Sequence, residues 1–174
     1  KYGESSGDFP ISGDSIQTLG YPYLEDAKEM FPEKLKPKKL ITFVSQFTNG
    51  KEMSEFACKL SKIVGEEWEV VYKLHPSEVR WREIYKSLNH SNVRVIEDGE
   101  APSLYELFNQ SDIVVGVYST AIFEGLAFGC RTYILNLFGV EHMQLLIDDG
   151  ICKLINEPEE ISLDECSLAK SLDQ

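Results

Sequence analysis

Short apolar runs rich in β-branched residues alternate along this sequence with longer segments of helical period. The runs lie at 40–45, 68–74, 92–96, 112–117 and 131–136, and the helical segments at about 51–64, 79–88, 102–110, 120–129 and 141–149. Strands that alternate with helices form parallel sheets through crossover connections. The pattern therefore predicts a doubly wound, Rossmann-like α/β domain, with five to six parallel strands and helices on both faces.

Composition and charge narrow the class of protein. The 174 residues, 43% of them hydrophobic, suffice for one domain with a sizeable core. The formal net charge of -12 argues against a nucleic-acid or anionic-membrane partner, and any membrane association is expected to be at most peripheral. No apolar run approaches the roughly 20 residues that span a bilayer, and the first ten residues lack the features of a signal peptide.

The cysteines indicate the compartment. Cys58, Cys130, Cys152 and Cys166 show neither close pairing nor the spacing of metal ligands. Apolar neighbours surround the first three, which predicts mostly buried thiols. A reducing, cytoplasmic location is therefore expected.

The acidic excess is concentrated near the carboxyl end. Residues 141–174 carry 9 acidic and 2 basic side chains, whereas residues 39–140 carry 13 and 10. The acidic segment is therefore interpreted as solvated surface. Residues 1–18 are rich in Gly, Ser and Asp without a sustained period, so we expect a linker there and a single domain over residues 19–174.

His75 is the first candidate functional residue. Ligands of open parallel sheets bind beyond the carboxyl ends of the strands. His75 follows the second run, and Pro76 favours an extended conformation for it, which would project the imidazole into that crevice. There it could donate a hydrogen bond to a phosphate or act as an acid or base. The alternative is a structural histidine that caps the next helix.

The second candidate is the pair Ser119-Thr120, which follows the fourth run and opens a helix. Backbone N–H groups and hydroxyls at a helix amino end form an anion site, although Ser119 could also be a plain helix cap. Glu124 lies four residues after Thr120 and shares its face of the helix. Its carboxylate could accept hydrogen bonds from both hydroxyls of a ribose, or it could be a solvated surface group.

Several common motifs are absent. Gly50-Lys51 is not part of a Walker loop, and no GxGxxG follows the first run. The sequence contains no HExxH, CxxC or GxSxG. A classical dinucleotide site, a zinc site and a serine hydrolase are therefore not expected.

The segments LGYPYLED (19–26), YKLHPSE (72–78) and SDIVVGVYSTAIFEGLAFGCRTYILN (111–136) resemble the carboxy-terminal half of GT-B-type glycosyltransferases. The similarity is to capsule and surface-polysaccharide enzymes, including sialyl- and polysialyltransferase-like and CDP-glycerol glycerophosphotransferase-like groups. It covers about residues 19–150. Such enzymes have two Rossmann-like domains with the active site between them, so the resemblance implies that the amino-terminal domain is absent here and that this domain alone is inactive.

The resemblance also implies roles for individual residues. His75, Ser119 and Thr120 would contact the nucleotide phosphates, the loop Glu97–Pro102 would lie beside the base, and Glu124 would hold the ribose. The expected catalytic residue is His75, and the expected nucleotide- and phosphate-binding residues are Gln46, Thr48, Lys73, Pro76, Glu78, Glu97, Asp98, Tyr118, Ser119, Thr120 and Glu124.

The implied reaction is direct displacement at the sugar carbon of a CMP-, CDP- or UDP-linked donor, without a metal or other cofactor. The acceptor would be a polysaccharide or a lipid-linked glycan bound through the other domain. Two alternatives remain open. One is a domain similar to UDP-N-acetylglucosamine 2-epimerase, although the usual Asp-Ser-Gly-Gly run is replaced by Val117-Tyr118-Ser119-Thr120. The other is a non-catalytic nucleotide-binding or assembly module.

Overall fold

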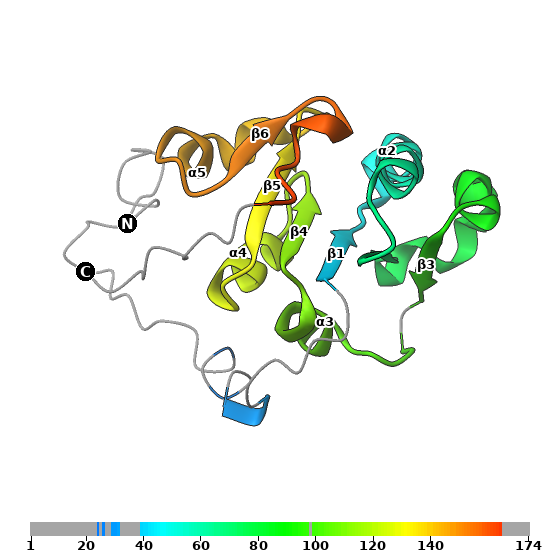
Figure 1. Cartoon of the computed structure of the whole chain (residues 1–174), viewed down its shortest axis with the longest axis horizontal. Helices are drawn as coiled ribbons and strands as arrows, with labels where there is room; N and C mark the ends of the chain where they lie inside the picture. The colour runs from blue at the N-terminus through cyan, green and yellow to red at the C-terminus, as the bar shows by residue number, and fades with distance from the viewer. Residues whose placement is uncertain (1–23, 25, 27–28, 32–38, 98, 165–174) are drawn as a thin grey trace, which may run out of the picture.

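A six-stranded parallel sheet forms the centre of the computed structural model, which describes residues 24, 26, 29–31, 39–97 and 99–164 (Figure 1). The strand order is β3-β2-β1-β4-β5-β6, so the order along the sheet reverses between β1 and β4. In chain order the elements, with η marking a 3-10 helix, are β1 (Lys39–Val44), η2 (Phe47–Asn49), α2 (Gly50–Ile63), β2 (Trp68–Lys73), η3 (Pro76–His90), β3 (Val93–Ile96), α3 (Leu104–Gln110), β4 (Ile113–Gly116), α4 (Thr120–Ala127), β5 (Arg131–Leu135), η4 (Val140–Met143), α5 (Gln144–Asp148), β6 (Lys153–Ile155) and η5 (Pro158–Glu160).

The sheet is buried on both faces, as the apolar runs predict. Ile41 and Phe43 of β1 pack on one face with residues of α2 and η3. Leu40 and Val44 point to the opposite face, where α3, α4 and α5 pack. Figure 1 shows these two helical layers on either side of the strands. The predicted doubly wound Rossmann-like architecture is confirmed.

The pairing register places the strand ends together at one edge. Phe43 in the central strand pairs with Tyr72 of β2 on one side and with Val115 of β4 on the other. The segments after β1, β2 and β4 therefore leave the sheet side by side. This edge is where a parallel doubly wound sheet binds its ligands.

Two expected helices differ from the observed elements. The segment expected as a helix over 79–88 is the 3-10 helix η3, whose buried residues Tyr85 and Leu88 are three apart. That spacing places residues on one face in both helix types, so the sequence did not distinguish them. The segment expected over 141–149 is divided between η4 and the short helix α5.

Other expectations are confirmed where the structure describes the residues. Cys58, Cys130 and Cys152 are buried thiols that form no disulfide, and burial raises the pKa of Cys152 to about 12. Cys166 and the linker expected over residues 1–18 lie outside the described residues. Among the described residues, no helix has the length and apolar character needed to cross a bilayer.

Because β4 packs closely against α4, we expect substitution of Gly116 to destabilise the fold. A methyl group on Gly116 would lie 2.6 Å from Cδ1 of Ile122 and 2.9 Å from Cγ2 of Val44, and both neighbours are buried. Gly116→Ala should therefore lower the free energy of unfolding by about 1–3 kcal/mol, measured by urea denaturation.

Gly65→Ala is the matched control, because its methyl group would meet its nearest neighbour, Cγ of Glu67, at an ordinary 3.9 Å. We expect this variant to be neutral, or more stable by up to about 1 kcal/mol through the reduced entropy of the unfolded chain. Equal stability of the two variants would contradict the close contact at Gly116.

Candidate functional site

A pocket of about 480 Å³ opens at the carboxyl ends of the strands, beside the reversal between β1 and β4. Ser45 follows β1, His75 follows β2 and Ser119 follows β4, and all three line it. The loop from Gly99 and the first residues of α3 close the opposite side. Of the expected site residues, the catalytic candidate His75 and the binding candidates Lys73, Pro76 and Ser119 line this pocket.

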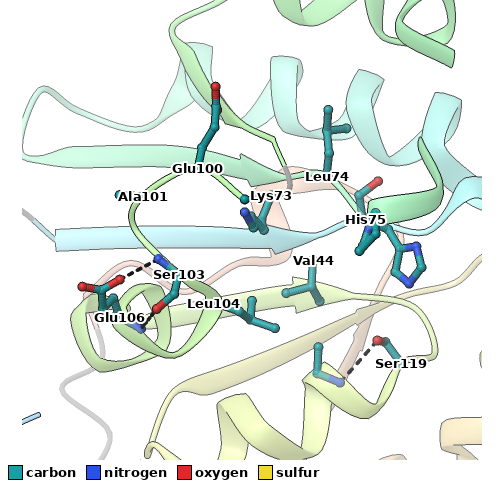
Figure 2. Close-up of a pocket in the computed structure, with 14 residues that line it drawn as sticks. Val44, Lys73, Leu74, His75, Glu100, Ala101, Ser103, Leu104, Glu106 and Ser119 are labelled. Carbon is teal, nitrogen blue, oxygen red and sulfur yellow. Dashed lines mark hydrogen bonds between the residues drawn. The ribbon is translucent and has the colours of Figure 1, made fainter. Parts of the chain in front are cut away.

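The two ends of the pocket differ in polarity. Figure 2 shows Glu100 and Ser103 at one end, His75 and Ser119 at the other, and Lys73 between them. The Glu100 end contains the carboxylates of Glu100 and Glu106, which accept hydrogen bonds from the backbone N–H groups of Glu97 and Ser103, whereas the His75 end contains an imidazole and the start of α4. An elongated ligand with a hydrogen-bonding base and an anionic group would match this polarity.

His75 caps the helix that follows it. Its Nδ1 accepts a hydrogen bond from the backbone N–H of Ser77 at 3.2 Å, so the structural interpretation of this histidine is confirmed. A backbone N–H can only donate, which places the proton of the neutral ring on Nε2. Because the cap uses only Nδ1, the ring keeps its Nε2–H group as a donor. His75 is exposed and lines the pocket.

Glu78 lies beneath the pocket and does not line it. Its side chain is 0% exposed, and its carboxylate accepts hydrogen bonds from Ser45 Oγ at 2.9 Å, from His75 N at 2.6 Å and from the hydroxyl of Tyr85. Three internal donors hold this buried carboxylate. We therefore revise its expected role from ligand contact to support of the loop that carries His75.

Two tyrosines complete the buried network around Glu78. The hydroxyl of Tyr72 contacts Ser45 Oγ at 2.8 Å and donates to the carbonyl of Gly50 at 3.2 Å. Burial raises the pKa of Tyr72 and also the pKa of Tyr85, whose hydrogen bond to Glu78 adds to the effect. Both phenols are therefore neutral donors near neutral pH. A Cβ at position 50 would collide with the side chain of Tyr85, so glycine at this position leaves the space that Tyr85 occupies.

Ser119 opens α4 at the pocket. Its hydroxyl accepts a hydrogen bond from the backbone N–H of Ala121 at 3.3 Å, so it is a helix cap as well as a lining residue. Thr120 is the exposed first residue of α4 and is not part of the lining. The amino end of a helix carries a partial positive charge that favours anions.

Tyr118, which precedes Ser119, contacts two other expected residues, Gln46 and Thr48, and all three lie outside the pocket lining. Oε1 of Gln46 accepts a hydrogen bond from the backbone N–H of Tyr118 at 3.0 Å. The hydroxyls of Thr48 and Tyr118 lie 3.1 Å apart. These contacts join the segment after β1 to the segment after β4 and thereby support the position of Ser119.

Lys73 is tied to the loop after β3. Its Nζ donates to the carbonyl oxygen of Glu97 at 2.5 Å, so Glu97 contributes its backbone to this contact. Asp98, the next expected residue, lies outside the described residues. The side chain of Glu124 accepts a hydrogen bond from Tyr105 at 3.1 Å and is half-buried, which excludes a fully solvated surface carboxylate.

The start of α3 belongs to the pocket lining, but its residues are missing from the expected set. Ser103 caps α3, and the carboxylate of Glu106 accepts a hydrogen bond from the backbone N–H of Ser103 at 2.7 Å. Those hydrogen bonds lower the pKa of Glu106. The capping-box spacing of Ser103 and Glu106 is visible in the sequence and marks a helix start at the same sheet edge.

No group of three or more His, Cys, Asp or Glu side chains that could hold a metal ion occurs among the residues that the structure describes. The expected independence from a metal stays a prediction.

Comparisons with known proteins support the fold. No protein-family model and no curated protein matches the chain. Among solved structures, UDP-GlcNAc 2-epimerase from Neisseria meningitidis bound to UDP-GlcNAc matches with a TM-score of 0.52 and 20% identity, over 78% of this chain and 37% of its own. The wall teichoic acid polymerase TagF matches with a TM-score of 0.51 and 16% identity, over 85% of this chain and 41% of its own.

The glycosyltransferase SnogD from Streptomyces nogalater matches with a TM-score of 0.50 and 16% identity, over 86% of this chain and 37% of its own. The chain thus spans about two fifths of the length of each of these three structures. These similarities concern the fold: the chain has the Rossmann-like architecture found in GT-B-type glycosyltransferases and in UDP-GlcNAc 2-epimerase.

The buried network predicts a large effect on stability at Glu78. Glu78→Ala removes the acceptor of three donors in the protein interior, of which Ser45 and Tyr85 contribute side chains. We expect the free energy of unfolding to fall by about 2–4 kcal/mol in urea denaturation.

Glu55→Ala is the matched control, because Glu55 lies exposed on α2. Its free energy of unfolding should stay within about 0.5 kcal/mol of the wild-type value. If Glu78→Ala is as stable as this control, the hydrogen bonds of Glu78 do not stabilise the segments that form the site.

Proposed function

We propose that this chain binds the nucleotide of an activated sugar donor and acts as the donor-binding domain of a glycosyltransferase. The observation that carries the proposal is the pocket at the reversal point of the sheet, where the amino end of α4 and the ring of His75 converge. Reversal points of doubly wound sheets are the usual place of nucleotide binding. The net charge of the chain is no obstacle, because helix ends and hydroxyls hold small anions without a basic surface.

We assign the proposed ligand an orientation from the polarity of the pocket. The phosphate would lie between His75 and Ser119, where an imidazole N–H donor and a helix amino end are available. Lys73 in the middle of the pocket would contribute a positive charge. The base would lie against the loop that includes Glu100, whose carboxylate and backbone offer hydrogen-bond acceptors. Glu124 would hold the ribose.

The same fold occurs in proteins that support this choice of ligand. The epimerase from Neisseria meningitidis was solved with UDP-GlcNAc bound. TagF is a polymerase of wall teichoic acid, and SnogD is a glycosyltransferase. We extend this use of the fold to the present chain, with a role in surface-polysaccharide biosynthesis.

In the proposed reaction an acceptor hydroxyl attacks the sugar carbon, the bond from that carbon to the phosphate oxygen breaks, and the hydroxyl proton passes to a base on the acceptor side. Negative charge develops on the departing phosphate oxygen, and the Nε2 proton of His75 would form a hydrogen bond with that oxygen. The amino end of α4 opposes the same charge. The reaction as proposed needs no metal, since these groups supply the electrostatic stabilisation.

The proposal includes the partners implied by the family resemblance. A second Rossmann-like domain would supply the site for a polysaccharide or lipid-linked acceptor, with at most a peripheral membrane association. A cytoplasmic location and the absence of a nucleic-acid partner are further parts of the proposal.

Epimerisation is the second candidate function, because a UDP-GlcNAc 2-epimerase is among the matching structures. It differs from transfer in needing no acceptor. Incubation of UDP-GlcNAc with a protein that includes this chain, followed by separation of the epimers, would distinguish the two. Epimer formed without an acceptor would favour the second function.

Calorimetric titration of the chain with CMP, CDP and UDP, and with their sugar conjugates, tests the proposal directly. We expect saturable binding of at least one nucleotide, and weaker binding of the matching nucleoside because the phosphate contacts are then lost. Absence of binding by every nucleotide, at concentrations up to several millimolar, would contradict the proposal.

Two substitutions separate the binding role of His75 from its capping role. Asparagine is a good helix cap, so His75→Asn should keep the fold, whereas His75→Ala should lower the free energy of unfolding by about 1 kcal/mol. Both variants lose the ring N–H and should bind the nucleotide about tenfold more weakly, by calorimetry.

Binding of the nucleoside provides the internal control, since it lacks the phosphate and should be unchanged in His75→Asn. Unchanged affinity of His75→Asn for the nucleotide would remove His75 from the proposed phosphate site.

A further inference from the structure

Tyr105 of α3 and Glu124 of α4 form a hydrogen bond between the two helices beside the pocket. The hydroxyl of Tyr105 donates to Oε1 of Glu124 at 3.1 Å, and the contact is partly buried. Tyr105 is not among the site residues expected from the sequence. The pair is separated by 19 residues in the sequence and meets only because both helices pack on the same face of the sheet.

The ring of Tyr105 is held by aromatic packing. It stacks on Phe128 with ring centroids 5.7 Å apart and an angle of 24° between the planes. Phe128 in turn packs against the fully buried Phe108, at 6.1 Å. The phenol oxygen therefore has a defined position that does not depend on its hydrogen bond.

Neither residue of the pair lines the pocket, but each lies next to lining residues of its own helix. Ser103 and Leu104, which immediately precede Tyr105, line the pocket. Ala121, which lies one helical turn before Glu124, lines it from the other side. A carboxylate has about four acceptor sites, so one hydrogen bond from Tyr105 leaves it able to accept others.

We propose that Tyr105 is a positioning residue that fixes the Glu124 carboxylate to accept the hydroxyls of a ribose, and thereby makes the site select ribonucleotides over 2′-deoxyribonucleotides. This inference rests on the proposed nucleotide-binding function. A free glutamate side chain must lose rotamer freedom on binding, and a carboxylate already oriented by Tyr105 avoids much of that loss. The ring stacking provides the fixed point from which the orientation is set.

Tyr105→Phe tests the inference, because it keeps the ring that stacks on Phe128 and removes only the hydroxyl. The probes are whichever of CMP, CDP and UDP the wild-type chain binds, and its 2′-deoxy counterpart, both measured by calorimetry. The wild-type chain should prefer the ribonucleotide by about tenfold. In Tyr105→Phe the ribonucleotide should bind about five- to tenfold more weakly and the deoxynucleotide nearly unchanged, so the preference approaches one.

Tyr133→Phe is the matched control, since it removes a hydroxyl that accepts from Ser162 N and does not line the pocket. It should leave the preference intact. In Glu124→Ala the preference should already be lost, and adding Tyr105→Phe should reduce it no further, because the two residues act through one contact.

The outcomes are distinguishable. If the wild-type chain binds no nucleotide, the proposed function fails and this inference fails with it. If the wild-type chain prefers the ribonucleotide and Tyr105→Phe keeps that preference, or weakens both ligands equally, Tyr105 is only a structural brace between α3 and α4. That result would overturn the inference and leave the proposed function standing.

Discussion

A buried carboxylate connects the parts of the molecule on which the pocket depends. Glu78 accepts hydrogen bonds from the residue that follows β1, from the backbone at the end of β2 and from the middle of η3. Such a group is stable in a protein interior only when its hydrogen bonds are satisfied, so those three segments are constrained together. The position of His75 is one consequence, because its own backbone N–H is among the donors.

Two neighbouring phenols belong to the same buried network. Tyr72 and Tyr85 stay protonated because burial raises the pKa of each, and each can therefore donate. The absence of a side chain at Gly50 provides the space that Tyr85 needs. A polar layer thus lies under the pocket, between the hydrophobic core and the exposed edge where a ligand would bind.

The sequence alone was sufficient to predict the architecture, and it also located the pocket edge. Apolar runs with no polar alternation identify strands buried on both faces, and parallel strands require their ends to meet. His75 and Ser119 were found in this way, because each follows directly after such a run. Ser103 and Glu106 were missed even though their capping-box spacing was visible, since that pattern marks a helix start without showing whether its residues also line a ligand pocket.

Tertiary packing decided whether a polar residue is buried in the interior or lines the pocket. Glu78 and Glu106 are both glutamates three residues after a helix cap, yet one is fully buried and the other lines the pocket. The pairing of Tyr105 with Glu124 likewise arises from helices that meet only in the folded state. Local periodicity determined the elements and their order, because it reflects interactions within a few residues. The partners of the polar groups depend on contacts between distant segments, and these exist only once the sheet and its two helical layers have assembled.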